Sequence, residues 1–211
     1  RVWEMRGFGD VTFEAASIGE PCLGYIVENR IIQLALLECI DKMEEVDILS
    51  PASCVAFDRN GSGMSVTLQD QRVLKCRLLI GADGANSEVR DSFGITIQMD
   101  TYNQSCLVAS VITDYPQQEI TWQRFTSSGP QAFLPLPGHH ASLVWYDQRE
   151  IIDSLIKLDL TKLGEKFQEK FPGELGLIKV HSRGSFDLFK HHAKNYVQNR
   201  LALIGDAAHT I

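Results

Sequence analysis

Two segments of the 211-residue sequence place an aspartate directly after a short apolar run. In RLLIGADG, Asp83 and Gly84 follow the run, and in RLALIGDAA, Asp206 stands between Gly205 and Ala207. Such runs are typical of strands in layered α/β sheets, where ligands bind at the carboxyl edge. A carboxylate there can accept hydrogen bonds from sugar or ribityl hydroxyls, and small neighbours let a ligand approach the backbone. The two aspartates are therefore the first candidates for a binding site.

The sequence after Asp83 predicts a short helix that could add phosphate binding to this site. Ser87 is a typical helix N-cap, and Gly94 is typical of a helix end. Free N–H groups at the start of a helix attract phosphate. Each aspartate also has a purely structural interpretation, because Asp-Gly is a common turn and Asp206 could simply cap a following helix.

The remaining sequence contains no pattern of a metal centre or of a catalytic nucleophile. The five cysteines include no C-x-x-C pair and none at zinc-ligand spacing from a histidine, which favours reduced cysteines packed as small apolar residues. No spacing indicates a Ser-His-Asp set, and G-x-S-x-G is missing. We expect His139-His140 and His191-His192 at the surface, while His209 either approaches a cofactor or serves packing.

Composition excludes several classes of protein. Lys plus Arg is 20 against 27 for Asp plus Glu, so the formal charge is −7, which disfavours nucleic-acid binding. Hydrophobic residues make up 44% of the sequence, which excludes a disordered chain. No apolar run is long enough to cross a bilayer.

The apolar periodicity predicts sheets alternating with helices. We expect a hairpin in residues 1–19, a buried helix from about residue 24 to 43, an antiparallel meander in residues 54–80, further strands in residues 102–147, a helix along residues 156–171 and a strand at residues 201–204. The meander ends in the continuous apolar run 78–82, which favours burial on both faces. Asn29 lies on the apolar stripe of the first helix, where a buried amide needs a partner, either a cofactor or a backbone carbonyl.

The motifs together resemble those of a known family. Residues 77–90 are similar to the DG motif, and residues 201–209 to the GD motif, of the flavoprotein aromatic hydroxylases typified by para-hydroxybenzoate hydroxylase. Within that group, residues 23–37, 125–138 and 196–211 resemble the ubiquinone-biosynthesis hydroxylases. Among their branches, the segment HHAKNYVQ (residues 191–198) most resembles the branch that acts on polyprenyl methoxy-methyl-benzoquinols.

The resemblance implies an α/β fold in which part of a Rossmann-like FAD-binding domain is interleaved with an α+β antiparallel-sheet substrate domain. We assign residues 1–21 and 98–199 to the substrate domain and residues 22–97 and 200–211 to the FAD-binding domain. The family's G-x-G-x-x-G region and flavin-facing loop have no counterpart in this sequence. We therefore expect a fragment of a longer protein that holds FAD weakly or not at all. Where the family usually has Phe-Pro-Leu, this sequence has Phe186-Asp187-Leu188.

The resemblance also implies roles for matched residues. The expected FAD-binding residues are Asn29, Asp83, Gly84, Arg90, Gly205, Asp206 and Ala207. Asp206 would bind the ribityl chain, its two neighbours would contribute backbone groups, and Asp83 would serve the pyrophosphate and the approach of NAD(P)H. Arg90 would steady the motif. In the substrate sheet, Trp122 and Phe133 are candidates to face a quinol ring, with core packing as the alternative.

The implied activity is hydroxylation of a polyprenyl quinol or phenol intermediate of ubiquinone biosynthesis by an FAD-dependent monooxygenase that uses NAD(P)H and dioxygen. No side chain needs to be a catalytic nucleophile, because the cofactor carries the chemistry. The alternatives are a non-catalytic scaffold subunit of a ubiquinone-synthesis complex, or another FAD enzyme such as a reductase or halogenase. A polyprenyl substrate is compatible with a cytoplasmic protein in peripheral contact with the inner membrane and with other ubiquinone-biosynthesis proteins.

Overall fold

The computed structural model describes the chain apart from residues 62, 117–118, 172 and 211. The chain divides into two compact units, Arg1–Ile40 with Tyr102–Leu188 and Asp41–Thr101 with Phe189–Ile211. The predicted domain segments change at residues 22, 98 and 200 instead, so the helix near residue 30 belongs to the first unit by its contacts. That these units are the substrate and FAD-binding domains stays a prediction.

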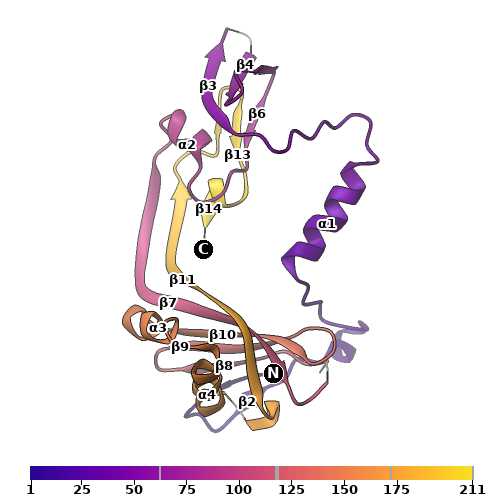
Figure 1. The fold of residues 1–211 in the computed structure, drawn as a ribbon, viewed down its shortest axis with the longest axis vertical. Coiled ribbons are helices and arrows are strands. Elements are labelled where there is room, and N and C mark those ends of the chain that lie inside the picture. Colours follow the sequence, from indigo (N-terminus) through magenta and orange to yellow (C-terminus); the bar gives the residue numbers. More distant parts are fainter. Residues whose placement is uncertain (62, 117–118, 172, 211) are drawn as a thin grey trace. The chain divides into compact units, whose positions relative to one another are not determined.

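The first unit is built on a largely antiparallel sheet (Figure 1), in the order β11-β7-β10-β9-β8-β1-β2. Its strands are β1 (Val2–Glu4), β2 (Asp10–Val11), β7 (Ile97–Thr113), β8 (Trp122–Thr126), β9 (Gly129–Pro135), β10 (His140–Gln148) and β11 (Ile178–Ala193). Residues 97–101 of β7 and 189–193 of β11 belong to the second unit. Its helices are α1 (Asn29–Ile40), α3 (Arg149–Leu155) and α4 (Leu160–Lys170), with short 3-10 turns η1 (Ala15–Ile18) and η2 (Gly173–Leu175). The predicted hairpin and the strands of residues 102–147 are confirmed.

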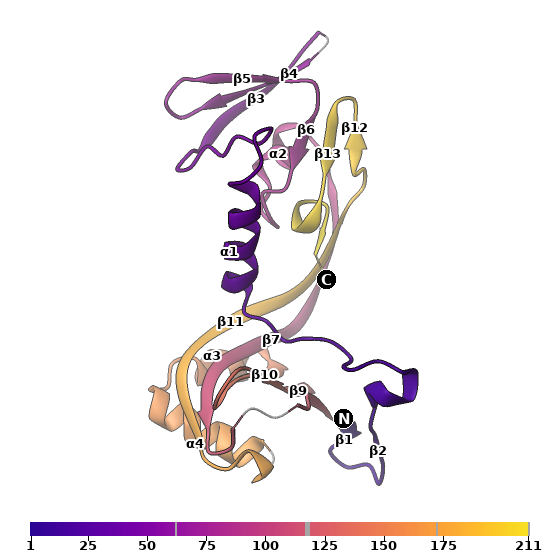
Figure 2. The same ribbon diagram turned by 90° about the vertical axis from the view of Figure 1, so that its right-hand side faces the viewer.

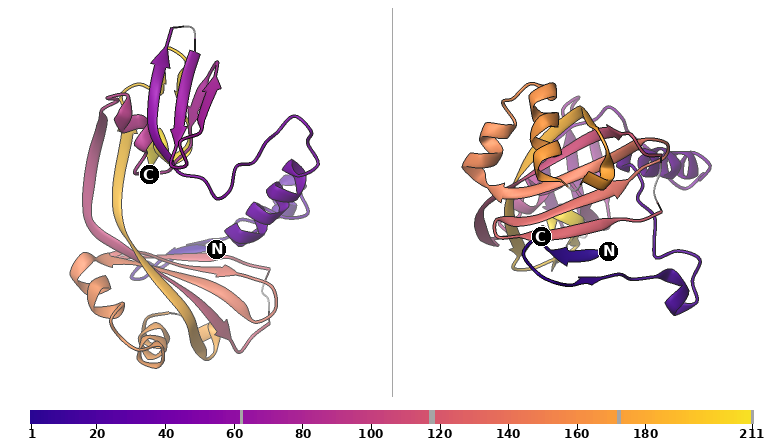
Figure 3. Two further views of the ribbon diagram at one scale, coloured as in Figure 1. Left: turned by 45° about the horizontal axis from the view of Figure 1, so that its top comes forward. Right: turned by 90° about the horizontal axis from the view of Figure 1, so that it is seen from below.

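Helices α3 and α4 cover one face of this sheet (Figures 1 and 3). In β10, Leu143 and Trp145 are buried in the core beneath the helices. Val144 and Tyr146, each the next residue along the strand, are only half-buried. This alternation is the period-two pattern of a strand with one covered face. The opposite face of the sheet is therefore open in this unit.

The predicted helix along residues 156–171 is shorter than expected and corresponds to α4, and a separate helix, α3, precedes it. Asp159 ends the connection between α3 and α4, because its carboxylate accepts a hydrogen bond from the Lys162 amide (2.9 Å) and caps α4.

Asp187, at the position where the family usually has proline, lies within the continuous strand β11. Its carboxylate accepts hydrogen bonds from the Ser105 hydroxyl and from Arg149 Nη1, both at 2.8 Å.

The prediction that the first helix is buried is wrong. Helix α1 has no buried residue, and Leu36 is 57% exposed. Asn29, its first residue, is also exposed, so it is not a buried amide in need of a partner. A helix that is apolar on several sides is buried only where other elements enclose it. Among the described residues of its unit, none does so.

The second unit contains two small sheets. Strands β3 (Cys54–Asn60), β4 (Gly63–Leu68) and β5 (Val73–Cys76) form an antiparallel sheet, and β6 (Leu79–Gly81), β13 (Leu201–Leu203) and β12 (Val197–Gln198) form another. Figure 2 shows the last three strands side by side. Helix α2 (Glu88–Ser92), the 3-10 turn η3 (Gly205–Ala207) and β14 (His209–Thr210) complete the unit.

The predicted meander is confirmed for β3, β4 and β5, although Ser62 in its first turn lies outside the described residues. Its last strand does not continue to residue 80. The apolar run instead forms β6, which pairs in parallel with β13. Burial of this run on both faces is wrong, because Ile80 is 51% exposed. Side chains from α2 and β13 pack against only one face of β6.

Among the helices of the described residues, none is long and apolar enough to cross a membrane.

Gly81 sets how closely β6, β13 and α2 can approach one another. A Cβ atom at this position would lie 2.9 Å from both Leu203 Cδ2 and Val89 Cγ1. We expect Gly81→Ala to lower the free energy of unfolding by about 1–3 kcal/mol, as overpacking of a core does. Urea unfolding measures this change. The matched control is Gly24→Ala, where a Cβ would meet no atom within 4 Å and stability should change little; equal losses in both variants would refute the packing role of Gly81.

Candidate cofactor-binding site

The parallel pairing of β6 and β13 brings the two aspartate turns to one sheet edge. Leu79 pairs with Leu201 and Gly81 with Leu203, so both strands end at the same level. Asp83 follows the end of β6, and Asp206 follows the end of β13. The Ile204 amide donates to the carbonyl of Gly81 (2.9 Å) and continues the connection beyond the paired strands. The sequence prediction of two turns at one carboxyl edge is confirmed.

The Asp83 carboxylate is committed to the start of helix α2. Its Oδ1 accepts a hydrogen bond from the Ser87 hydroxyl (2.5 Å), and its Oδ2 accepts one from the Val89 amide (3.0 Å). Ser87 in turn caps the helix by accepting a bond from the Arg90 amide (3.0 Å). Burial alone would raise the pKa of Asp83, but these hydrogen bonds outweigh it, so the pKa lies below its ordinary value of 3.8.

The Asp206 carboxylate is free for a ligand. The residue is exposed, and its carboxylate has no hydrogen-bond partner among the residues that the structure describes. The backbone amides of Gly205 and Asp206 likewise donate to no other described residue, because the first two amides of the 3-10 turn η3 have no partner within the turn. This turn therefore presents one negatively charged acceptor together with two unused donors.

Arg90 joins the two turns, as its predicted steadying role requires. Its side chain is 4% exposed, and Nη1 donates to the carbonyl of Ala85 at 2.9 Å and to that of Ala207 at 3.4 Å. Nε also bonds Asp91 Oδ1 at 3.1 Å, which balances the buried charge. The guanidinium thus fixes the loop after β6 against the turn after β13.

Two glycines supply the backbone conformations of the turns. Gly84 has φ +83° and Gly205 has φ +57°, values that side-chain-bearing residues rarely adopt. Neither glycine has an atom within 4 Å of a Cβ position. Glycine is therefore required at both positions for the backbone conformation of the turn. The space beside each glycine remains open for a ligand.

The structure corrects the expected surface position of His191. Its side chain is 1% exposed, and Nε2 lies 2.9 Å from the backbone carbonyl of Asp206. Because a carbonyl oxygen only accepts, Nε2 carries the proton and donates. Sequence reasoning missed this residue. The available signal was its alternation with Ala193, which is also buried on the same face of β11.

His209, Tyr196 and His192 form a group of stacked rings. His209 stacks on His192 with 5.7 Å between ring centroids and on Tyr196 with 5.8 Å. The Tyr196 hydroxyl lies 2.9 Å from His192 Nδ1. His209 therefore has a packing role in this unit, one of the two roles expected for it.

The other predicted site residues belong to the first unit. Asn29 opens α1 in an exposed position. Trp122 and Phe133 are buried and stacked 5.6 Å apart in the core that α4 covers. The ring centroid of Phe171 lies 5.9 Å from that of Trp122. Core packing, the alternative interpretation of both aromatics, is their role in this structure, and neither points to the open face of the sheet.

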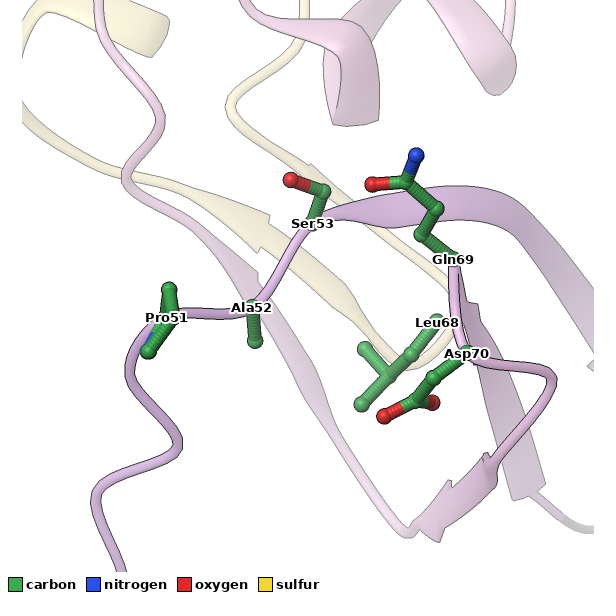
Figure 4. A pocket seen from close by; sticks show the side chains of 6 residues that line it. All are labelled: Pro51, Ala52, Ser53, Leu68, Gln69 and Asp70. Atoms are coloured by element: carbon green, nitrogen blue, oxygen red, sulfur yellow. The ribbon is translucent and has the colours of Figure 1, made fainter.

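Two hollows of the described surface contain none of the predicted site residues. One, of about 320 Å³, is lined by Pro51, Ala52, Ser53, Leu68, Gln69 and Asp70 (Figure 4). Its Asp70 carboxylate is occupied by the amide and Nε of Arg72. The other, of about 290 Å³, lies near Arg124 and Lys170 in the first unit. Within the described ranges, no three His, Cys, Asp or Glu side chains gather as metal ligands would.

Parallel strands that deliver acidic, small-residue turns to one edge, beside the start of a helix, define a nucleotide-binding α/β protein. The chain belongs to the family described as FAD binding domain, whose model matches residues 32–211. The predicted flavoprotein family and α/β fold class are confirmed, and the two aspartate turns lie within the matched range.

Two curated proteins are similar to this chain over most of its length. The chain is 42% identical to the 3-demethoxyubiquinol 3-hydroxylase of Escherichia coli (strain K12) over 209 residues, covering 99% of this chain and 53% of that protein. It is 36% identical to the ubiquinone hydroxylase UbiL of Rhodospirillum rubrum, covering 89% of this chain and 44% of that protein. The chain thus spans about half the length of these relatives.

A solved structure supports the fold. The crystal structure of p-nitrophenol 4-monooxygenase PnpA from Pseudomonas putida aligns with a TM-score of 0.72 at 17% identity, covering 85% of this chain and 47% of that one. At this identity the likeness shows the fold alone.

The lowered pKa of Asp83 predicts a pH-dependent stability. A carboxylate with a lowered pKa stabilises the fold at pH above its ordinary value, and this contribution is lost as pH falls through the folded-state pKa. Asp83→Asn removes the titration. The difference in free energy of unfolding between wild type and variant should be constant above about pH 5 and shrink below about pH 4. Urea unfolding from pH 7 to pH 3 measures it; a difference that stays constant to pH 3 would contradict this assignment.

Proposed function

We propose that the protein is an FAD-dependent monooxygenase that hydroxylates the aromatic ring of a polyprenyl quinol or phenol intermediate of ubiquinone biosynthesis, with NAD(P)H as electron donor. The activities named for the Escherichia coli and Rhodospirillum rubrum relatives support this proposal. The observation that carries it in this chain is the exposed Asp206 carboxylate, unpartnered among the described residues and placed on a turn with two unused amides.

The residues of the turn fit the cofactor. The Asp206 carboxylate is suited to accept hydrogen bonds from ribityl hydroxyls, and the exposed amides of Gly205 and Asp206 are suited to donate to acceptor oxygens of the same molecule. Ala207, which is buried, stays a proposed backbone neighbour of the cofactor. Asp83 acts indirectly in this proposal, because its carboxylate is used to hold the start of α2. When bound, FAD supplies the redox chemistry, taking electrons from NAD(P)H and activating dioxygen. Asn29 stays a proposed further contact of the cofactor.

The open face of the first unit's sheet is the proposed surface for the substrate ring. Its half-buried side chains include Leu134, Val144 and Tyr146, the sequence neighbours of residues in the helix-covered core. The apolar side chains of Leu134 and Val144, with the hydroxyls of Tyr146 and Ser142 on the same face, suit a quinol ring and its prenyl tail. These side chains replace Trp122 and Phe133 as the proposed ring contacts, because a one-residue step along a strand changes the face.

Asp206→Ala tests the cofactor site in the intact protein. Loss of the charged acceptor should weaken FAD binding about 10- to 100-fold, since hydrogen bonds to charged groups contribute about 1.5–3 kcal/mol. Quenching of flavin fluorescence on titration measures the dissociation constant. The control is Asp100→Asn, at an exposed acidic residue away from the turns, which should bind FAD as wild type does. Unchanged FAD affinity in Asp206→Ala would remove Asp206 from the site.

Phe133→Ala and Leu134→Ala separate the two faces of the sheet. Phe133 is 2% exposed, so its truncation should cost about 3–5 kcal/mol of stability. Leu134→Ala should cost about 1 kcal/mol or less but raise the KM for a quinol substrate. Thermal unfolding and substrate-stimulated NAD(P)H oxidation give the two measurements. An unchanged KM in Leu134→Ala would exclude the open face as the substrate surface.

Labelled dioxygen distinguishes the proposed activity from its alternatives. A monooxygenase places one labelled oxygen atom in the product ring, whereas a reductase or halogenase does not. A scaffold subunit would show no substrate-stimulated NAD(P)H oxidation at all. Absence of label in a product formed under turnover would rule hydroxylation out.

A further inference from the structure

The turn that carries Asp206 is held by hydrogen bonds to each of its carbonyl groups. The Gly205 carbonyl accepts from the Ala208 amide (2.9 Å), and the Ala208 carbonyl accepts from the Ala193 amide (2.8 Å). The two carbonyls between them are bonded by side chains: that of Ala207 by Arg90, and that of Asp206 by His191. Only the first of these four bonds lies within the turn itself.

His191 is the contact nearest to the ligand-facing group. It bonds the carbonyl of the same residue whose carboxylate is exposed. The imidazole itself cannot shift freely, because it is 1% exposed, stacks on Phe189 with 5.8 Å between centroids, and has the Thr210 hydroxyl 3.5 Å from Nε2. The pairing of His191 with Thr210 in β11 and β14 fixes the backbone on either side.

We infer that His191 is a positioning residue for the cofactor, which orients the Asp206 carboxylate by holding the Asp206 peptide group. The inference rests on the proposed function, since it requires that Asp206 bind FAD. The imidazole does not touch the cofactor in this assignment. Its donor fixes the ψ angle of Asp206, and with it the direction in which the Asp206 side chain leaves the turn.

A donor of similar reach should replace the imidazole, and an apolar side chain should not. His191→Leu should weaken FAD binding about three- to tenfold, in line with the loss of one buried hydrogen bond to a carbonyl. His191→Gln should restore most of the affinity, because its amide nitrogen can donate to the same oxygen. Ile95→Val, a mild truncation in the buried core of the same unit, is the control for general destabilisation and should leave FAD affinity unchanged.

The decisive experiment is a double-mutant cycle of His191→Leu with Asp206→Ala, read as FAD dissociation constants of the intact protein by fluorescence titration. If His191 acts through Asp206, His191→Leu has no further effect once the carboxylate is gone. An equal weakening in both backgrounds, or no weakening by His191→Leu in wild type, overturns the inference. If Asp206→Ala alone leaves FAD affinity unchanged, the proposed FAD site fails and the inference fails with it. Should His191→Leu not fold, His191→Asn, whose amide is too short to reach the carbonyl, takes its place in the cycle.

Discussion

The site depends on the close parallel pairing of β6 with β13. Gly81 has no side chain, so Leu203 and Val89 can both pack against its backbone. This brings α2 near enough for Arg90 to reach the carbonyl of Ala207 on the turn after β13. A wider spacing would separate the two turns and leave a buried guanidinium without one of its acceptors, a costly state in a protein interior.

The two aspartates differ in whether their carboxylates have hydrogen-bond partners among the described residues. Asp83 accepts bonds from a hydroxyl and an amide of its own helix start, so its negative charge is used to order α2. Asp206 has no such partner in the described chain, and its charge stays available. The same residue type after the same kind of strand is therefore bonded in one turn and unbonded in the other. The difference arises from the residues that follow, because Ser87 lies within reach of Asp83, whereas alanines follow Asp206.

The sequence predicts those features that local pattern determines. The β3–β5 meander, the two aspartate turns and the capping by Ser87 follow from alternation, glycine placement and capping chemistry, and they are confirmed. The sequence-based prediction fails where the burial of a residue depends on elements that are distant in sequence. The burial of α1 depends on elements that enclose it, and the face on which Phe133 lies depends on which side α4 covers. His191 is polar and flanked by charged residues, so composition places it at the surface, and only its pairing beside the Asp206 turn shows that it is buried.

The hydrogen bonding of the Asp206 turn also restricts what it can recognise. All four carbonyls from Gly205 to Ala208 already accept a hydrogen bond from a protein donor. The groups of the turn without a protein partner are one carboxylate, which needs donor groups, and the amides of Gly205 and Asp206, which need acceptor oxygens. A ligand that satisfies both must carry hydroxyl groups and acceptor oxygens close together, as a ribityl phosphate does. A flat apolar molecule would leave both the carboxylate and the amides unsatisfied, and a bare anion would leave the carboxylate unsatisfied, so the turn disfavours both.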